Sequence, residues 1–184
     1  MQNQALYRSE MSDRLQILID QDRLARRVSE LARQISEDYR GRCPILVAVL
    51  KGGFIFMADL IRELDIEFVV DFIAIGSYGG NRNSSGAVKL LKDLNHDISG
   101  EDVIFIEDIV DSGLSLSYIY ANFLARQPKS IEVVTLLDKI ENRKADLRIK
   151  YVGFEIPAKF VIGYGLDLDE RFRGLPYIAC LTED

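Results

Sequence analysis

The segment from residue 103 to residue 115 restricts the possible folds of this chain more than any other stretch. Four apolar residues, Val103 to Ile106, predict a buried parallel strand. Three carboxylates follow within five positions, and a loop of mostly small residues, 111–115, then opens an amphipathic helix. Such a loop presents backbone N–H groups and the positive end of the helix dipole, which together bind anions. Acids beside this cradle indicate a ligand that combines a phosphate with hydroxyl groups or a metal, as a ribose phosphate does.

The three acids are Glu107, Asp108 and Asp111. An Asx-type turn is the simpler interpretation of residues 111–113 when they are taken alone. Two adjacent acids at the end of a buried strand favour a binding site over a simple turn, because buried charges are costly without partners. Ligands of open α/β sheets bind at that end of the strands. We therefore interpret the segment as a binding site.

Residues 107–113, Glu-Asp-Ile-Val-Asp-Ser-Gly, resemble the phosphoribosyl-diphosphate (PRPP) signature of type I phosphoribosyltransferases, in the form found in the hypoxanthine–guanine members. The resemblance extends over about residues 15–182. It implies a purine salvage enzyme that transfers the 5-phosphoribosyl group from PRPP to N9 of hypoxanthine or guanine, with xanthine as a third candidate base. The products would be IMP or GMP and diphosphate. The resemblance also implies a homodimer or a homotetramer.

Strands that alternate with helices through the middle of the chain predict an α/β protein with a mostly parallel central sheet flanked by helices. We expect strands at 45–50, 68–75, 88–93, 103–106, 131–137, 151–156, 160–164 and 177–181, and helices at 22–39, 54–64 and after residue 115. The resemblance implies the type I phosphoribosyltransferase fold as a single domain, 1–184, with a small hood built from the N-terminal and C-terminal segments. Residues 76–87 include four glycines and predict a mobile loop, which would serve as a lid that excludes water.

The composition limits which classes of partner the protein can bind and where in the cell it is expected. The formal net charge of −6 argues against a nucleic-acid-binding surface. The longest clean apolar run, 45–50, is too short to span a bilayer, and the N-terminus lacks the apolar core of a signal peptide. We expect a cytoplasmic protein that binds small molecules and neither nucleic acid nor membranes.

Histidine and cysteine content narrows the metal chemistry. His96 is the only histidine, which excludes His-rich zinc sites, and its polar surroundings predict a solvated loop. Cys43 and Cys180 lack metal-ligand spacing and are expected to be free, buried thiols. Any metal must therefore be held by oxygen ligands, which favours Mg²⁺ as the cofactor.

The resemblance assigns roles to the acids and to the phosphate loop. Asp111 would be the general base that takes the N7 proton of the purine. Glu107 and Asp108 would accept hydrogen bonds from the ribose hydroxyls, directly or through the metal, which Asp167 would also bind. The loop that would hold the 5′-phosphate consists of Asp111, Ser112, Gly113, Leu114 and Ser115.

The diphosphate and the base have their own expected ligands. Lys51, Gly52 and Arg173 would bind the diphosphate, with a cis peptide between residues 50 and 51. Ser77 and Tyr78 would cover it from the lid. The base would be held by three residues, namely Lys139 at its 6-oxygen, Phe160 stacked on its ring and Val161 at its edge through the backbone. An ammonium group only donates hydrogen bonds, so it selects an oxo over an amino group. Leu168 stands where the family has an aromatic residue.

Each of these residues has a simpler interpretation when taken alone. Residues 51–53 could be a glycine turn with an exposed lysine, Lys139 a solvated lysine, and Phe160 part of the core. Two other functions remain open alternatives. An adenine or pyrimidine phosphoribosyltransferase is disfavoured by Lys139 followed by Phe160 and Val161. A PRPP-sensing regulator that binds nucleic acid is disfavoured by the acidic balance.

Overall fold

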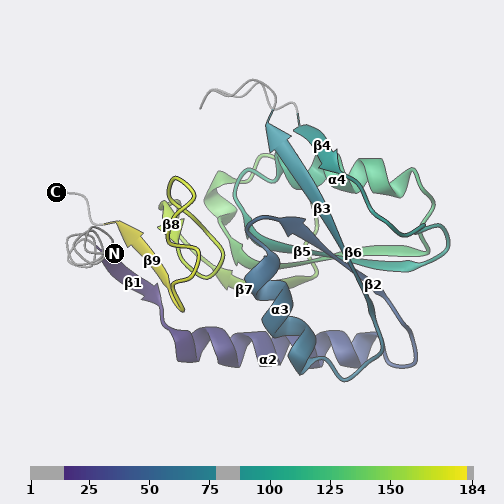
Figure 1. Cartoon of the computed structure of the whole chain (residues 1–184), viewed down its shortest axis with the longest axis horizontal. Coiled ribbons are helices and arrows are strands. Elements are labelled where there is room, and N and C mark those ends of the chain that lie inside the picture. Colours follow the sequence, from purple (N-terminus) through teal and green to yellow (C-terminus); the bar gives the residue numbers. More distant parts are fainter. Residues whose placement is uncertain (1–14, 78–87, 182–184) are drawn as a thin grey trace, which may run out of the picture.

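The computed structural model describes residues 15–77 and 88–181. They form a six-stranded sheet in the order β4-β3-β2-β5-β6-β7 and a three-stranded sheet in the order β1-β9-β8 (Figure 1). In the larger sheet every neighbouring pair is parallel except β3 and β4, which are antiparallel. Its strands are β2 (Ile45–Leu50), β3 (Val69–Ser77), β4 (Val88–Lys92), β5 (Asp102–Val110), β6 (Ser130–Asp138) and β7 (Tyr151–Glu155).

Helices cover both faces of the larger sheet, as predicted. The helices α2 (Gln21–Asp38) and α3 (Phe54–Glu63) pack on one face and α4 (Leu114–Leu124) on the other (Figure 1). Alternate residues of each strand supply the two cores, because successive side chains of a strand point to opposite faces. Ile104 and Ile106 join the core beneath α2 and α3, whereas Val103 and Phe105 join the core beneath α4.

A side-chain cap begins α2, and an aromatic contact holds α4 against the sheet. The carboxylate of Asp20 accepts a hydrogen bond from the backbone N–H of Arg23 at 2.8 Å and caps the N-terminus of α2. In α4, Phe123 meets the ring of Phe105 edge to face, with ring centroids 5.1 Å apart. Such a contact contributes about 0.5–1.5 kcal/mol beyond the burial of the two rings. It helps to hold the phosphate-loop helix against the central strand.

The strand that carries the acids is longer than predicted. We expected it to end at Ile106, but β5 continues to Val110 and includes Glu107 and Asp108. It continues because β6 pairs with it along its whole length, from Asp102 to Val110, whereas pairing with β2 ends at Ile106. The two acids therefore lie where the sheet opens on one side of β5.

The smaller sheet joins segments from the two ends of the described chain. It consists of β1 (Leu15–Ile19), β9 (Ile178–Leu181) and β8 (Val161–Ile162), and Leu15 pairs with Leu181. The strand expected at 160–164 is reduced to two residues. The reason is a run of positive φ values after it, 97° at Gly163, 50° at Tyr164 and 103° at Gly165, which no extended strand can contain.

Other sequence predictions have mixed outcomes. Cys180 is buried and free as expected, but Cys43 is exposed, so the prediction of its burial was wrong. Cys43 precedes β2 at the edge of the core rather than inside it. Residues 78–87, most of the predicted lid, lie outside the described residues. Among the helices of the described ranges, none has the length and apolar character needed to cross a membrane.

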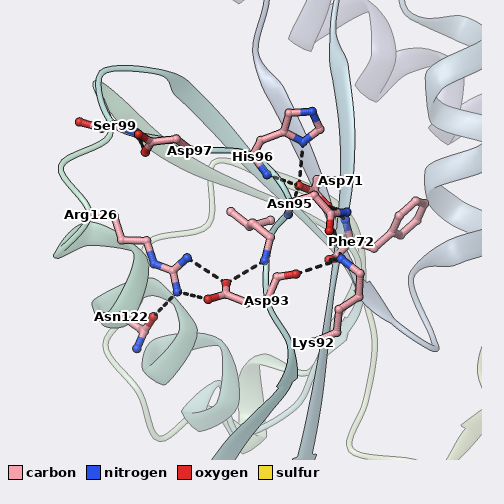
Figure 2. A network of polar contacts seen from close by, with 11 residues as sticks. Asp71, Phe72, Lys92, Asp93, Asn95, His96, Asp97, Ser99, Asn122 and Arg126 are labelled. Carbon is pink, nitrogen blue, oxygen red and sulfur yellow. Dashed lines mark hydrogen bonds and ion pairs between the residues drawn. The ribbon is translucent and has the colours of Figure 1, made fainter.

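A buried carboxylate fixes the chain between β4 and β5 to β3 (Figure 2). Asp71 is only 2% exposed and accepts hydrogen bonds from the backbone N–H groups of Phe72, Asn95 and His96 at 2.7, 2.8 and 3.0 Å. The ring Nδ1 of His96 lies 2.8 Å from the same carboxylate. About half of the His96 side chain is exposed, in agreement with the predicted loop position. The sequence did not reveal its contact with the buried Asp71 carboxylate.

The pKa of Asp71 follows from this environment. Burial alone would raise it, but the hydrogen bonds from the His96 side chain and from three backbone N–H groups outweigh burial and lower the pKa to about 2. The ordinary pKa is 3.8. The charge therefore stabilises the fold above about pH 4, and this contribution is lost as the pH falls toward about 2.

Replacing Asp71 by asparagine preserves the shape of the side chain and removes its charge. We expect Asp71→Asn to lower the free energy of unfolding by about 2 kcal/mol at pH 7. About half of this difference should remain near pH 3, because there Asp71 is still mostly ionised in the folded protein but mostly protonated in the unfolded chain. Urea denaturation at both pH values measures the difference. Asp97→Asn, an exposed carboxylate of the same loop, is the control and should change stability little. An equal loss at the two pH values would contradict the role of the charge.

Candidate active site

The carboxyl ends of β2, β3 and β5 meet at a cavity of about 270 Å³. Its lining comes from the end of β2, from Gly52, from Ile75 of β3, from residues 107–113 and from the first turn of α4. This is the position at which open α/β sheets bind ligands. Of the residues that the sequence singled out, it gathers Gly52, the three acids, and Ser112, Gly113 and Ser115 of the phosphate loop.

The loop after β5 has the geometry of an anion cradle. Gly113 precedes α4 with a φ of 76°, a conformation that favours glycine. The Ser112 hydroxyl accepts a hydrogen bond from the N–H of Leu114 at 3.4 Å. Leu114 and Ser115 begin the helix and are exposed. The first-turn N–H groups of α4 and the two serine hydroxyls are thus placed at the mouth of the cavity, where a phosphate would fit.

Glu107 is buried and Asp108 is partly buried, and the acidity of both carboxyl groups is altered. Burial and the neighbouring charge of Asp108 raise the pKa of Glu107 well above its usual value. Burial also raises the pKa of Asp108 to about 6, although the N–H of Ile109 and the positive charge of Arg173 act in the opposite direction. Both carboxyl groups line the cavity, so a cation or a hydrogen-bond donor that enters it would restore their ionised form.

Glycines allow three segments to meet beside Asp108. A methyl group added to Gly52 would overlap the Asp108 carboxylate, and one added to Gly165 would overlap the carbonyl oxygen of Gly52. The peptide bond between Leu50 and Lys51 is cis, as the resemblance implied. The loop after β2 is therefore in contact with β5 below it and with the segment after β8 above it.

Charged side chains link the loop after β2 to the C-terminal segment. Lys51 Nζ lies 2.8 Å from Glu170 Oε2, and Arg173 Nη2 lies 3.3 Å from the same oxygen. Arg173 Nη2 also lies 2.8 Å from Asp167 Oδ1. Positive φ values of 50° at Asp169 and 63° at Glu170 form the turn that presents Glu170 to both cations. One carboxylate therefore bridges the two cationic residues expected to bind diphosphate.

Arg173 also has an unused hydrogen-bond donor. Its Nη1 donates to the carbonyl oxygen of Gly165 at 2.8 Å, whereas its Nε is buried without a partner among residues 15–77 and 88–181. A buried, unpartnered N–H of a guanidinium is costly unless a ligand accepts from it. This observation fits an anion beside Arg173.

Asp111 lies at the rim of the cavity between two donors. Lys139 Nζ lies 2.9 Å from Asp111 Oδ2, and Asn142 Nδ2 donates to Asp111 Oδ1 at 2.8 Å. Burial would raise the pKa of Asp111, but the hydrogen bonds from Lys139 and Asn142 outweigh it and lower the pKa. Lys139 is itself buried except for about a tenth of its side chain, so it is not the solvated lysine of the simpler interpretation.

The remaining predicted residues lie farther along the same region or outside the description. Phe160 is 56% exposed and so is not a core residue, while Val161 is buried and pairs with Cys180. Ser77 ends β3, and Tyr78 lies outside the described residues. Asn142 and Glu170 were missed, because nothing in the sequence marks an asparagine after a strand or a glutamate in a polar turn as part of a site.

The donor set for a metal consists of oxygen atoms alone. Asp108 and Asp167 influence one another electrostatically, and Glu107 adjoins Asp108. Within the described ranges, no three His, Cys, Asp or Glu side chains are arranged as a ready-made metal site. A metal bound here would take further ligands from a bound molecule, as Mg²⁺ does with substrate phosphates.

Comparison with known proteins identifies the family. A family profile described as "phosphoribosyl transferase domain" matches residues 16–169. The chain belongs to the phosphoribosyltransferase family. It is 48% identical to the hypoxanthine-guanine phosphoribosyltransferase of Bacillus subtilis (strain 168), over 90% of this chain and 92% of the relative. It is 45% identical to the corresponding protein of Streptococcus thermophilus (strain CNRZ 1066), over 91% of this chain and 93% of the relative.

Solved structures agree with the family and the fold. A hypoxanthine phosphoribosyltransferase from Staphylococcus aureus superposes with a TM-score of 0.89 at 42% identity, covering 94% of each chain. A hypoxanthine-guanine phosphoribosyltransferase from Bacillus anthracis, with a HEPES molecule in its active site, gives a TM-score of 0.87 at 47% identity, covering 91% of this chain and 98% of that one. The predicted type I phosphoribosyltransferase fold is confirmed.

The buried acids of this phosphoribosyltransferase predict a stability change with pH. Asp108 keeps its proton in the folded protein up to about pH 6, whereas the unfolded chain loses it near 3.8. Unfolding therefore releases a proton in this range, and the free energy of unfolding falls as the pH rises through it. Without ligand, Asp108→Asn should raise that free energy by up to about 3 kcal/mol at pH 8 and by little at pH 4.

Urea denaturation of the ligand-free protein at the two pH values checks this prediction. Asp146→Asn, which changes an exposed carboxylate, is the matched control and should change little. Asp108→Asn should lose activity although it gains stability, because the substitution removes a carboxylate that is expected to bind substrate. A gain of equal size at pH 4 and pH 8 would show that burial of the charge is not its cause.

Proposed function

We propose that this phosphoribosyltransferase transfers the 5-phosphoribosyl group of PRPP to N9 of hypoxanthine or guanine and releases diphosphate. The observation that supports it most strongly is the pairing of Asp111 with Lys139 at the rim of the cavity, 2.9 Å apart. One group accepts a proton and the other donates hydrogen bonds. A 6-oxopurine offers a proton at N7 and an acceptor at its 6-oxygen, next to one another on the ring edge.

The charge pattern of the cavity suits the other substrate. The loop at 111–115 would bind the 5′-phosphate at the N-terminus of α4. Glu107 and Asp108, adjacent on β5, would accept hydrogen bonds from the ribose hydroxyls, and their pKa values would fall as those bonds form. Lys51 and Arg173 would bind the diphosphate, which would complete the partners of the buried Arg173 Nε.

These residues have distinct tasks in the proposed reaction. N9 of the base attacks C1′ of the ribose while the bond from C1′ to the diphosphate oxygen breaks. Asp111 takes or shares the N7 proton, so that the base becomes more nucleophilic. Lys139 stabilises negative charge on the 6-oxygen. Phe160, exposed just before β8, would stack on the purine, and Val161 would contact its edge through the backbone.

We further propose Mg²⁺ as the metal of the PRPP complex. Asp167, with Glu107 and Asp108, supplies carboxylate oxygens of the kind that Mg²⁺ prefers. When bound, the ion would neutralise charge on the departing diphosphate. The cytoplasmic location and the homodimer or homotetramer expected from the sequence stay predictions, as do the single domain 1–184 and the lid.

Substrate choice tests the proposed function. The ammonium of Lys139 and the 6-amino group of adenine are both hydrogen-bond donors, so they cannot bond to one another. A site built around one polar contact discriminates between two such substrates by several kcal/mol, on the order of 10⁴-fold. We expect turnover of hypoxanthine and guanine with PRPP and none detectable with adenine. The ultraviolet absorbance of each nucleotide product measures the turnover. Lys139→Ala should lower kcat/KM for both 6-oxopurines about 100-fold and leave the affinity for PRPP nearly unchanged.

Lys144→Ala is the control for this experiment, since Lys144 is an exposed lysine of the same segment that contacts Ser112 only through its backbone N–H. Comparable rates with adenine and hypoxanthine in the wild-type protein would refute the assignment of the base. Binding of PRPP without turnover of any purine would point instead to a regulator.

Metal removal is a separate test. Because the diphosphate leaves with several negative charges, we expect EDTA to abolish turnover and excess Mg²⁺ to restore it. The melting temperature in EDTA should stay the same, since no three His, Cys, Asp or Glu side chains of the described residues are arranged to hold a metal without a ligand. Full activity in the chelator would contradict the carboxylate–metal assignment, including the role of Asp167.

A further inference from the structure

The segment after β6 is fixed against the phosphate loop by its backbone. The N–H of Lys139 donates to the carbonyl oxygen of Val110 at 2.9 Å. The N–H groups of Lys144 and Ala145 donate to the carbonyl oxygen of Ser112 at 2.9 and 3.2 Å. Between these anchors lies the short 3₁₀ helix η1 (Ile140–Asn142). Its last residue is therefore held at a defined position relative to Asp111.

Asn142 and Lys139 divide the Asp111 carboxylate between them. Asn142 Nδ2 donates to Oδ1 at 2.8 Å, and Lys139 Nζ contacts Oδ2 at 2.9 Å. The backbone N–H of Asn142 in turn donates to the carbonyl oxygen of Lys139 at 3.0 Å. Each oxygen thus has one side-chain donor, and the two donors come from the same turn.

The two donors differ in what happens when a base binds. In the proposed function Lys139 also serves the 6-oxygen of the purine, so its ammonium must share its hydrogen bonds. Asn142 has no such task, since its amide is neutral and engages only Oδ1. A carboxylate held through one oxygen cannot rotate freely, and the other oxygen is then aimed at the proton it must accept.

We infer that Asn142 is a positioning residue for Asp111, which holds Oδ1 and thereby presents Oδ2 to the N7 proton of the base. This inference rests on the proposed function and adds to it a residue that acts through Asp111. The amide donor also favours the ionised form of the carboxylate, which is the form that accepts a proton. Loss of the amide should therefore affect the chemical step more than PRPP binding.

Three variants test the inference, with hypoxanthine and PRPP as substrates. Asn142→Ala removes the donor, and we expect kcat to fall roughly 3- to 10-fold, the worth of one hydrogen bond, while the KM for PRPP changes less than about twofold. Asn142→Asp keeps the shape but places a carboxylate against Oδ1, so kcat should fall further. Glu141→Ala changes the exposed neighbour in the same turn and should behave like wild type.

The pH dependence separates positioning from a general loss of structure. A like charge raises the pKa of a carboxyl group, so the acid limb of the kcat profile should move to higher pH in Asn142→Asp and less so in Asn142→Ala. Lys139, the charged side chain in contact with Asp111, is retained in both variants. A carbon-13 NMR titration of Asp111 in the ligand-free protein should show the same order of pKa values.

The outcomes distinguish this inference from the proposed function. Folded Asn142→Ala and Asn142→Asp proteins with wild-type kcat, acid limb and Asp111 titration would overturn the inference and leave the proposed function intact. A KM for PRPP that rises as much as kcat falls would overturn it too, because the effect would then be structural. A wild-type protein inactive on every 6-oxopurine would refute the proposed function, and the NMR titration alone would then decide whether Asn142 controls Asp111.

Discussion

The arrangement of this protein follows from the cost of placing two adjacent carboxyl groups inside a hydrophobic sheet. Glu107 and Asp108 belong to β5. The strand β6 pairs with β5 along its whole length, whereas the pairing of β2 with β5 ends at Ile106. Burial raises the pKa of both groups, and the N–H of Ile109 and the charge of Arg173 offset this only in part for Asp108. The ligand-free protein thus holds two unfavourable acids at the point where its sheet opens, and a substrate rich in hydroxyl groups would remove that cost.

The rest of the site is built around this point. The loop after β2 passes so close that only glycine fits above Asp108, and the segment after β8 comes so close to that loop that only glycine fits at position 165. Arg173, held by Gly165 and by Asp167, brings a positive charge to the acids from the segment between β8 and β9. Asp111 accepts hydrogen bonds from Lys139 and Asn142, which belong to the turn after β6. Binding groups from four separate parts of the chain therefore surround one short stretch of strand.

Much of this could be predicted from the sequence, for identifiable reasons. Apolar runs and their spacing predicted the parallel sheet, and the 107–113 motif located the site, because both are local patterns. The length of β5 could not be predicted, since polar residues end a strand by propensity and only pairing with β6 extends it. Contacts between distant residues were also missed, namely His96 with Asp71, Glu170 with Lys51, and Asn142 with Asp111. Each depends on how loops fold back, which single-residue preferences do not encode.

The pairing of β1 with β9 has a consequence for how the protein is made. Leu15 is synthesised before any strand of the six-stranded sheet, but its partner Leu181 is joined to the chain only after all of them. The six-stranded sheet is complete at Glu155, so it can assemble while the C-terminal segment is still being synthesised. The smaller sheet must close afterwards by a long-range contact, which is the slow kind. Phe160, Val161 and Arg173 reach their places with it, so a nascent chain acquires its phosphate loop, its buried acids and Lys139 first and the part of its active site after β7 last.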